Sequence, residues 1–288
     1  MTATQRVHCR SLFAPLAGAL TGSVLILAPA VARAEDAPDF LDAPFHIALG
    51  GYIVNTDTEV RLDGDAGTGT GTPVNLEETF GGGDVNRFRI DGHWRFADRH
   101  KARFMVFNSS RSESATLNED IDFGGETFPV SAKVDAEFQF DIYELAYEYA
   151  FLKRDSYEVA GSFGVHYTTL SFELKAKAST SNGTIATDLR EDASVDLPLP
   201  VFGLRGTWGL PYNFWLDAGA QYFALSIDEY DGSVQDYRVG LTWQPRKWLG
   251  IGLGYNVFRV DVDVDRKNFK GSLDWQYDGP MLSYSAMF

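Results

Sequence analysis

The sequence predicts an all-β fold, a transmembrane antiparallel up-and-down β-barrel of about ten strands, with about eight or twelve as the alternatives. Three observations predict it. The N-terminus has the features of an export signal, apolar and polar residues alternate along most of the remaining chain, and aromatic residues bracket the short connections.

The first 34 residues resemble a cleaved signal peptide. Arg6 and Arg10 give a basic start, residues 12–31 form an apolar, alanine-rich stretch, and Ala32-Arg33-Ala34 fits the small-x-small cleavage rule. We therefore assign residues 1–34 to a signal peptide and residues 35–288 to one β-barrel domain. The alternative, a retained membrane helix, is disfavoured because glycines and a proline interrupt the apolar stretch.

Charge and cysteine content argue against several functions. The 288 residues include 25 basic and 40 acidic side chains, and removal of the signal leaves 22 basic and 40 acidic, a net charge of −18. Nucleic-acid binding needs a basic surface, so we expect no nucleic-acid partner. The single cysteine, Cys9, lies in the signal, so disulfides, thiol catalysis and thiolate metal sites are not expected in the exported chain.

Alternation with a period of two recurs from segment to segment. In residues 87–96 an apolar face that includes Phe88, Ile90 and Trp94 opposes a charged face. A sheet that spans lipid must turn its apolar face outward, so we assign such faces to lipid and the charged faces to the barrel lumen. By the same rule Phe138 and Phe140 face lipid, and the phase of that strand must slip before Leu145.

The connections between these segments alternate in length. Short ones occur at residues 97–100, 153–156, 211–213 and 245–247, and longer ones run through residues 63–83, 118–127, 176–192, 229–233 and 265–271. Outer-membrane barrels have short periplasmic turns and long extracellular loops. Five long and four short connections predict ten strands, with both termini in the periplasm.

Large aromatic residues bracket the short connections, as in the interfacial girdle of a membrane barrel. The predicted girdle comprises Trp94, Phe96, Tyr149, Phe151, Tyr157, Trp208, Phe214, Trp243, Trp248 and Phe288. The last of these closes an alternating strand and resembles the terminal aromatic that the barrel assembly machinery reads in outer-membrane proteins. Pro280 predicts a β-bulge within that strand.

A barrel of about ten strands has a narrow interior, so charged lumen side chains are expected to pair with one another. The predicted lumen network comprises Arg87, Arg89, Asp91, His93, Arg95, Glu137, Asp141, Glu144, Glu148, Arg205 and Asp217. A selective ion path through these residues is the alternative interpretation.

Two constellations resemble enzymes of the outer membrane. Asp91-Gly92-His93 resembles the Asp-x-His pair of omptin proteases, although it lies near a short turn and lacks an acidic pair in register. His166 with Thr168 is similar to the histidine and serine of lipid A deacylases and phospholipases, but threonine replaces the nucleophile and no G-x-S-x-G motif occurs. We therefore predict no catalytic residues.

Other motifs do not indicate a cofactor or a metal. Asp261, Asp263 and Asp265 alternate with valines on one strand and would suit a divalent cation, but a solvated strand extension explains them better. The glycine-rich residues 64–71 lack the Lys-Ser/Thr of a phosphate-binding loop. We expect no cofactor and no metal.

The chain resembles a widespread set of proteobacterial outer-membrane β-barrel proteins, most of which have no known role. The resemblance covers nearly all of the exported chain and is strongest in residues 49–62, 74–79 (VNLEET) and 88–111. It implies a barrel fold and an outer-membrane location, reached through the cleaved signal peptide. It implies no catalytic residue.

These observations predict a non-enzymatic integral barrel of the bacterial outer membrane. Its role would be structural, a surface interaction, or narrow passive passage of small solutes; the alternative is an outer-membrane hydrolase of the lipid A deacylase, phospholipase or omptin type. Expected partners are outer-membrane lipids, lipopolysaccharide and the barrel assembly machinery. We expect the protein to be a monomer.

Overall fold

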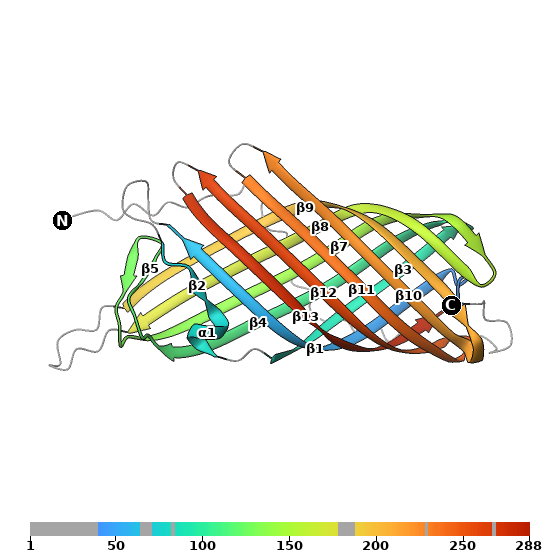
Figure 1. Ribbon diagram of the computed structural model, residues 1–288, viewed down its shortest axis with the longest axis horizontal. Helices are drawn as coiled ribbons and strands as arrows, with labels where there is room; N and C mark the ends of the chain where they lie inside the picture. The colour runs from blue at the N-terminus through green and yellow to red at the C-terminus, as the bar shows by residue number, and fades with distance from the viewer. Residues whose placement is uncertain (1–39, 64–70, 82–83, 178–187, 228–229, 267–268) are drawn as a thin grey trace, which may run out of the picture. The chain divides into compact units, whose positions relative to one another are not determined.

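The computed structural model describes residues 40–288 apart from residues 64–70, 82–83, 178–187, 228–229 and 267–268. The predicted signal peptide, residues 1–34, lies outside the described residues. The described chain forms a closed antiparallel barrel of ten long strands, which confirms the predicted fold (Figure 1). The barrel strands are β1 (Phe45–Leu62), β3 (Asp84–Ala97), β4 (His100–Thr116), β7 (Lys133–Arg154), β8 (Tyr157–Lys177), β9 (Asp188–Leu210), β10 (Phe214–Ile227), β11 (Tyr230–Arg246), β12 (Leu249–Arg266) and β13 (Phe269–Met287).

The barrel closes by pairing its last strand with its first. The register between β1 and β13 runs from His46 opposite Met287 to Leu62 opposite Gly271. The terminal residue takes part, because Phe45 N donates to Phe288 O at 3.1 Å and Phe288 N donates to Phe45 O at 2.9 Å. Closure satisfies backbone groups that lipid could not.

The two ends of the barrel differ. At one end, which we call the turn end, consecutive strands are joined by short connections such as residues 98–99 and the 3₁₀ turn Pro211–Asn213. At the other, the loop end, β1 and β3 are 21 residues apart and β4 and β7 are 16 residues apart. The predicted long connections between β1 and β3, between β4 and β7 and between β8 and β9 are therefore confirmed. Those predicted at residues 229–233 and 265–271 are wrong, because β10 ends at Ile227 and β11 begins at Tyr230, and β12 ends at Arg266 and β13 begins at Phe269. Among the described residues no helix is long and apolar enough to cross a membrane.

Strand β7 shows that the barrel has two halves of opposite character. Even-numbered residues point inward along the whole strand, from Val134 to Ala150. Towards the turn end the outward residues are apolar, as at Leu145, and the inward residues include Glu144 and Glu148. Towards the loop end the inward residues are apolar, as at Phe140, and the outward ones are polar. The phase is constant, so the predicted slip in this strand is wrong; the lining of the lumen changes instead.

The same reversal occurs on the strands across the barrel. On β12 the outward residues change from Leu253 near the turn end to Arg259 and Asp261 near the loop end. On β13 Trp275 and Tyr277 are 1% exposed and point inward. The β12–β13 register is continuous from Leu249 to Arg266, so the bulge predicted at Pro280 is also absent from these described strands. We call the two parts the turn half and the loop half.

Strand length explains why two halves exist. A membrane-spanning strand needs about 9–11 residues. Strands β7, β8 and β9 have 22, 21 and 23 residues. Each of these strands is therefore about twice as long as a membrane-spanning strand, and its loop half has the apolar inner face and polar outer face of a sheet in water.

The connection between β1 and β3 completes the wall of the loop half. Strand β3 begins at Asp84, so it does not pair with the parts of β1 and β4 that are nearest the loop end. In its place β2 (Val74–Asn75) pairs with β1, and α1 (Leu76–Phe80) follows, capped by the Asn75 side chain. Glu77 accepts from Thr58 N at 2.6 Å and from Arg111 Nη1 at 2.6 Å, which joins α1 to β1 and β4.

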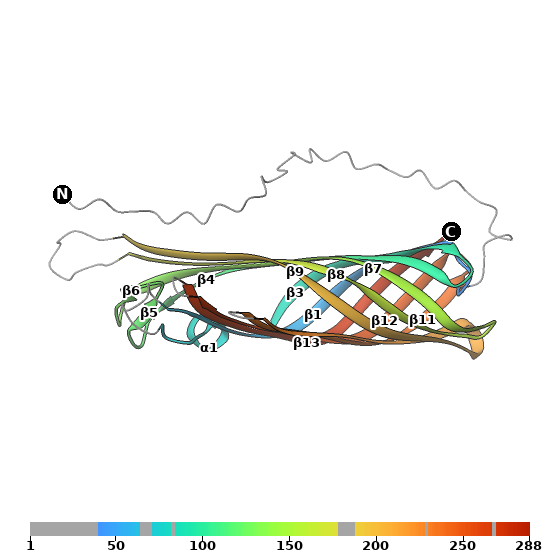
Figure 2. The same cartoon turned by 90° about the horizontal axis from the view of Figure 1, so that it is seen from above.

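A small hairpin packs at the loop end. It consists of β5 (Ile121–Phe123) and β6 (Glu126–Phe128), and it lies at the same end as α1 (Figure 2). Phe123 and Phe128 are fully buried, and Phe123 packs edge-on against Phe172 of β8 with ring centroids 5.1 Å apart. Gly124 N donates to Leu62 O of β1 at 3.0 Å. The hairpin therefore joins opposite walls of the loop half.

Candidate functional site

The inward face of the turn half carries most of the buried charge in the described residues. Six basic and six acidic side chains form ion pairs in the lumen, so the formal charges of this paired set balance. They are Arg89, Arg95, Lys101, Arg103, Arg205 and Arg238, with Asp91, Glu144, Glu148, Glu158, Asp217 and Asp236.

One cluster surrounds Arg89 at the middle of the barrel. Its Nε lies 3.1 Å from Asp91 Oδ1, and its Nη1 lies 3.9 Å from Asp236 Oδ2. Asn256 of β12 is fully buried and donates to Asp236 Oδ1 at 2.6 Å. Asn256 Oδ1 accepts from the Tyr277 hydroxyl at 3.0 Å. The polar groups of this cluster are thus bonded to one another, which a buried network requires.

A second cluster lies towards the turn end on β3, β4, β7 and β8. Glu158 accepts from Arg95 Nη2 at 2.7 Å and also binds Lys101. The Lys101 ammonium lies 2.6 Å from Glu148. A single ammonium therefore joins two carboxylates that are 1% and 3% exposed, and removal of any member would leave a buried charge without its partner.

A third group, on β4, β7, β9, β10 and β11, is held more loosely. Arg103 Nε and Arg205 Nε each lie 3.6 Å from Glu148 Oε2. Arg205 Nη1 lies 3.7 Å from Asp217 Oδ2, and Arg238 Nε lies 3.8 Å from the same oxygen. These distances are short enough for ion pairs but too long for hydrogen bonds.

The structure brings together many, but not all, of the residues predicted to form the lumen network. Arg89, Asp91, Arg95, Glu144, Glu148, Arg205 and Asp217 take part. Arg87 points inward nearer the loop half and donates to Ser110 O at 3.0 Å, and it forms no ion pair with a carboxylate of the described residues.

Glu137 and Asp141 are corrections to the predicted network. Both lie at odd positions on β7 and so point outward. Glu137 is exposed and pairs with Lys175 at 3.1 Å, while Asp141 accepts from Gln139 at 2.7 Å and from the exposed Asn108. The prediction failed because it placed the apolar face of β7 outward along its whole length.

Sequence reasoning left five of the network residues out of the predicted set: Lys101, Arg103, Glu158, Asp236 and Arg238. For Lys101 and Arg103 the cause is visible in the sequence. They are followed by four apolar residues without alternation, so the pattern did not show which face of β4 points inward. These residues are Phe104, Met105, Val106 and Phe107. The register shows the inward face, because Arg103 lies opposite Ala146, an inward position of β7.

The two histidine sites lack the geometry of an open catalytic centre. His166 is fully buried, its Nε2 lies 3.4 Å from Glu144 Oε2, and its ring stacks on Phe258 at 6.4 Å. His93 lies near the turn end, where its ring stacks on His46 with centroids 5.3 Å apart. Among the described residues no group of three or more His, Cys, Asp or Glu side chains could hold a metal ion.

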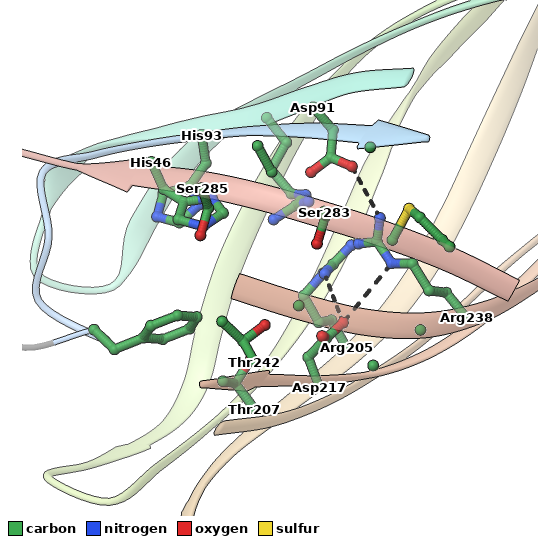
Figure 3. A pocket seen from close by; sticks show the side chains of 18 of the residues that line it. His46, Asp91, His93, Arg205, Thr207, Asp217, Arg238, Thr242, Ser283 and Ser285 are labelled. Carbon is green, nitrogen blue, oxygen red and sulfur yellow. Dashed lines mark hydrogen bonds and ion pairs between the residues drawn. The ribbon is translucent and has the colours of Figure 1, made fainter. Parts of the chain in front are cut away.

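A cavity of about 90 Å³ lies within the turn half, between the charged clusters and the turn end (Figure 3). In the view shown, Arg205, Arg238 and Asp217 point towards one another across it, and Thr242, Ser283 and Ser285 line its walls. A smaller cavity of about 20 Å³ shares Arg103, Arg205 and Arg238 with the larger one and is also lined by Glu148.

The segment that precedes β1 packs into the turn end. Phe40 stacks on the inward-facing Trp215 with ring centroids 4.9 Å apart, and Leu41 and Ala43 are buried. Asp42 pairs with Lys153 at 2.8 Å, and Lys153 also contacts Asp98 at 2.6 Å. Hydrogen bonds with Asp42 and Asp98 raise the pKa of Lys153, although partial burial opposes them. Phe40 and Leu41 line the large cavity and narrow its opening at this end.

An aromatic layer fills the lumen on the loop-half side of the charged clusters. Phe107, Phe140, Phe258, Trp275 and Tyr277 are each 0–1% exposed. Phe140 and Trp275 come from opposite walls and have ring centroids 3.8 Å apart, and Phe107 stacks on Tyr277 at 5.3 Å. Side chains thus meet across the full width of the barrel at this level.

The outward aromatic residues of the turn half form two rows. Of the predicted girdle, Tyr157 and Phe214 are half-buried, and the others are exposed at the turn end: Trp94, Phe96, Tyr149, Phe151, Trp208, Trp243, Trp248 and Phe288. The sequence reading missed a second row, which lies where the outward residues become polar. It contains Tyr143, Tyr167, Tyr222, Tyr237 and Tyr255, all exposed.

No family model matches the chain, and no curated protein matches it. Among solved structures, the outer-membrane protease OmpT from Escherichia coli aligns with a TM-score of 0.55 and 10% identity, over 88% of this chain and 100% of that chain. The toluene transporter TodX of P. putida aligns with a TM-score of 0.38 and 9% identity, over 86% and 90%. The attachment invasion locus protein Ail of Yersinia pestis aligns with a TM-score of 0.30 and 10% identity, over 82% and 97%.

Of these three structures, OmpT is similar enough to bear on the fold. The likeness extends over the whole of that protease, and the strands of both chains form one barrel. At 10% identity it does not extend to the chemistry of the site. The chain therefore has the β-barrel fold of bacterial outer-membrane proteins.

Proposed function

We propose that the chain is an integral, non-enzymatic and non-conducting barrel of the bacterial outer membrane, whose loop half acts in surface interaction. The observation that carries this proposal is the aromatic layer. Its side chains are at most 1% exposed and contact one another from opposite walls. The β5–β6 hairpin packs beyond the layer, so a solute in the lumen would have to displace packed aromatic side chains.

The outward surface supports the membrane assignment. In the turn half exposed residues such as Phe163, Phe202 and Leu253 form an apolar belt bounded by the two aromatic rows. Exposed apolar surface of this extent marks a contact with lipid or with another protein, and a closed barrel with aromatic rims suits lipid. By analogy with such barrels, the turn end faces the periplasm and the loop half stands outside the cell.

The loop half presents a polar and mainly acidic surface. Its outward residues include Asp57, Glu59, Asp135, Glu137, Asp196, Asp261, Asp263, Asp274 and Asp278. Its interior is a packed apolar core, so the half is rigid enough to hold a recognition surface. We propose lipopolysaccharide and outer-membrane lipids as its surroundings, the barrel assembly machinery as the partner of β13, and a monomer as the working state.

Conductance of the refolded full chain in planar bilayers tests this function. We expect no steady single-channel steps, whereas a general porin added to the same membrane should give them. Regular steps from the purified chain would overturn the filled lumen and would favour the narrow-channel alternative.

The hydrolase alternative has less support. His166 has a carboxylate at 3.4 Å and Thr168 two residues along its strand, but both His166 and Thr168 are at most 1% exposed. A substrate ester or peptide bond would need an open approach to the base. Incubation of the refolded chain with lipopolysaccharide and with a peptide mixture, followed by mass spectrometry, tests it. Cleavage that His166→Ala or His93→Ala abolishes would overturn the non-enzymatic proposal.

A further inference from the structure

The large cavity of the turn half has more basic than acidic groups in its wall. Five cationic side chains and three carboxylates line it, together with hydroxyl groups. A water molecule needs about 10–15 Å³ of such space. At about 90 Å³ the cavity has room for a polyatomic ion together with water.

Three of the five cations are engaged by carboxylates at short range. Arg95 bonds Glu158 at 2.7 Å, Lys101 lies 2.6 Å from Glu148, and Arg238 donates to Asp91 at 3.2 Å. These pairs engage Asp91 and Glu158, two of the three carboxylates in the cavity wall, whereas the third, Asp217, makes only longer contacts with Arg205 at 3.7 Å and Arg238 at 3.8 Å.

Arg103 and Arg205 are different. Within the described part of the chain, neither guanidinium forms a hydrogen bond; their nearest carboxylates are Glu148 at 3.6 Å from each and Asp217 at 3.7 Å from Arg205. A guanidinium carries five N–H donors. Glu148 lines the smaller cavity and not the larger one, so donors of both arginines remain available on the side of the large cavity.

The wall formed by β11, β12 and β13, which lies opposite Arg103 of β4, is built from small and hydroxylated residues. Thr242 and Ser283 line the cavity, and glycines on β11 and β12 leave it open. A Cβ at Gly240 would come 2.6 Å from Asp217 Oδ1, and one at Gly252 would come 2.5 Å from Ser283 Oγ. Larger residues would therefore fill this space and crowd the hydroxyl and carboxylate groups that border it.

We propose that this cavity binds a small polyatomic oxyanion of the phosphate or sulfate class between Arg103, Arg205 and the hydroxyl groups of the opposite wall. Guanidinium groups match the oxygens of such anions with paired hydrogen bonds, which a monatomic ion does not accept in the same way. The aromatic layer closes the lumen on the side of the loop half, so the anion exchanges at the turn end, past Phe40.

Binding is tested on the refolded full chain in maltoside micelles, which contain no phosphate headgroups. Inorganic phosphate is titrated by calorimetry at constant ionic strength and pH, with chloride as the balancing anion. We expect saturable binding of phosphate and no comparable binding of chloride. An absence of saturable phosphate binding would overturn the proposal.

Variants locate the site. Arg205→Gln removes charged donors and is expected to weaken phosphate binding about tenfold to a hundredfold. Arg87→Gln is the matched control, since Arg87 also points inward but lines neither cavity. Thr242→Val keeps the shape of the wall and should weaken binding about twofold to tenfold, even if Arg205→Gln does not fold. Equal weakening by Arg87→Gln, or none by Thr242→Val, would contradict the proposed site.

Discussion

The turn half and the loop half are built from the same strands but have opposite inner and outer surfaces. On β7, Leu145 is 67% exposed on the outside of the turn half, whereas Phe140, five residues away, is fully buried inside the loop half. The reversal needs no change of strand phase. In the proposed membrane location the reversal follows the solvent outside, because lipid accepts apolar side chains and water does not.

The different outer surfaces of the two halves also explain how the lumen is filled in each half. Apolar outward residues in the turn half leave polar residues for its interior, and these form a balanced set of ion pairs. In the loop half the hydrophobic effect favours an apolar interior, and the aromatic layer and β5–β6 supply it. The first interior is held by paired charges, and the second by packed apolar side chains.

The largest expected effect comes from removing a ring of the aromatic layer. Phe140→Ala leaves a cavity among Phe107, Phe138, Phe258 and Trp275, and should lower the free energy of unfolding by about 3–5 kcal/mol. Denaturant unfolding in vesicles, followed by tryptophan fluorescence, measures it.

Ser112→Ala is the control for this change, because Ser112 is exposed on the outside of the loop half and should shift stability by no more than about 0.5 kcal/mol. A cost for Phe140→Ala as small as that of the control would mean that the loop half has no packed core.

A charge on the outside separates the halves most directly. Leu145→Arg places a guanidinium in the apolar belt and should destabilise the barrel by about 2–4 kcal/mol if the residue lies near the bilayer midplane. Ser112→Arg, on the neighbouring strand β4 but in the loop half, should be nearly neutral. The same vesicle unfolding experiment compares them, and equal costs at the two positions would remove the boundary between lipid and water.

The sequence predicted the fold well, since strand number and closure follow from alternation and from connection lengths. It predicted the residues of the lumen well only in the turn half, where apolar residues point outward and charged residues point inward. Arg89 and Asp91 were placed correctly because the outward neighbours in the turn half are apolar. Glu137 was not, because its strand had already passed into the loop half, where apolar residues point inward. In the proposed membrane location the boundary between the halves depends on where lipid ends, and the alternation of apolar and polar residues in one strand does not encode that position.

The site beyond those residues depends on contacts across the barrel. Arg238 on β11 meets Asp91 on β3, a separation of 147 residues, and local sequence gives no sign of that pairing. The role of Glu77 was equally hidden. The stretch VNLEET was singled out by resemblance alone, and the structure shows that it fills the gap left in the wall by the short strand β3.

The smallest expected effect concerns this repair of the wall. Glu77→Gln keeps the shape of the side chain but removes the charge that accepts from Arg111 and from Thr58 N, so the free energy of unfolding should fall by about 1–3 kcal/mol. Glu78→Gln, at an exposed side chain one residue along α1, is the matched control. Hydrogen exchange of the full chain should show faster exchange in α1 and the upper part of β4 of Glu77→Gln, and unchanged exchange in β3, since β3 belongs to the turn half. Uniformly faster exchange in both halves would mean that they unfold as one unit. The two halves would then differ in the residues they contain but not in their unfolding.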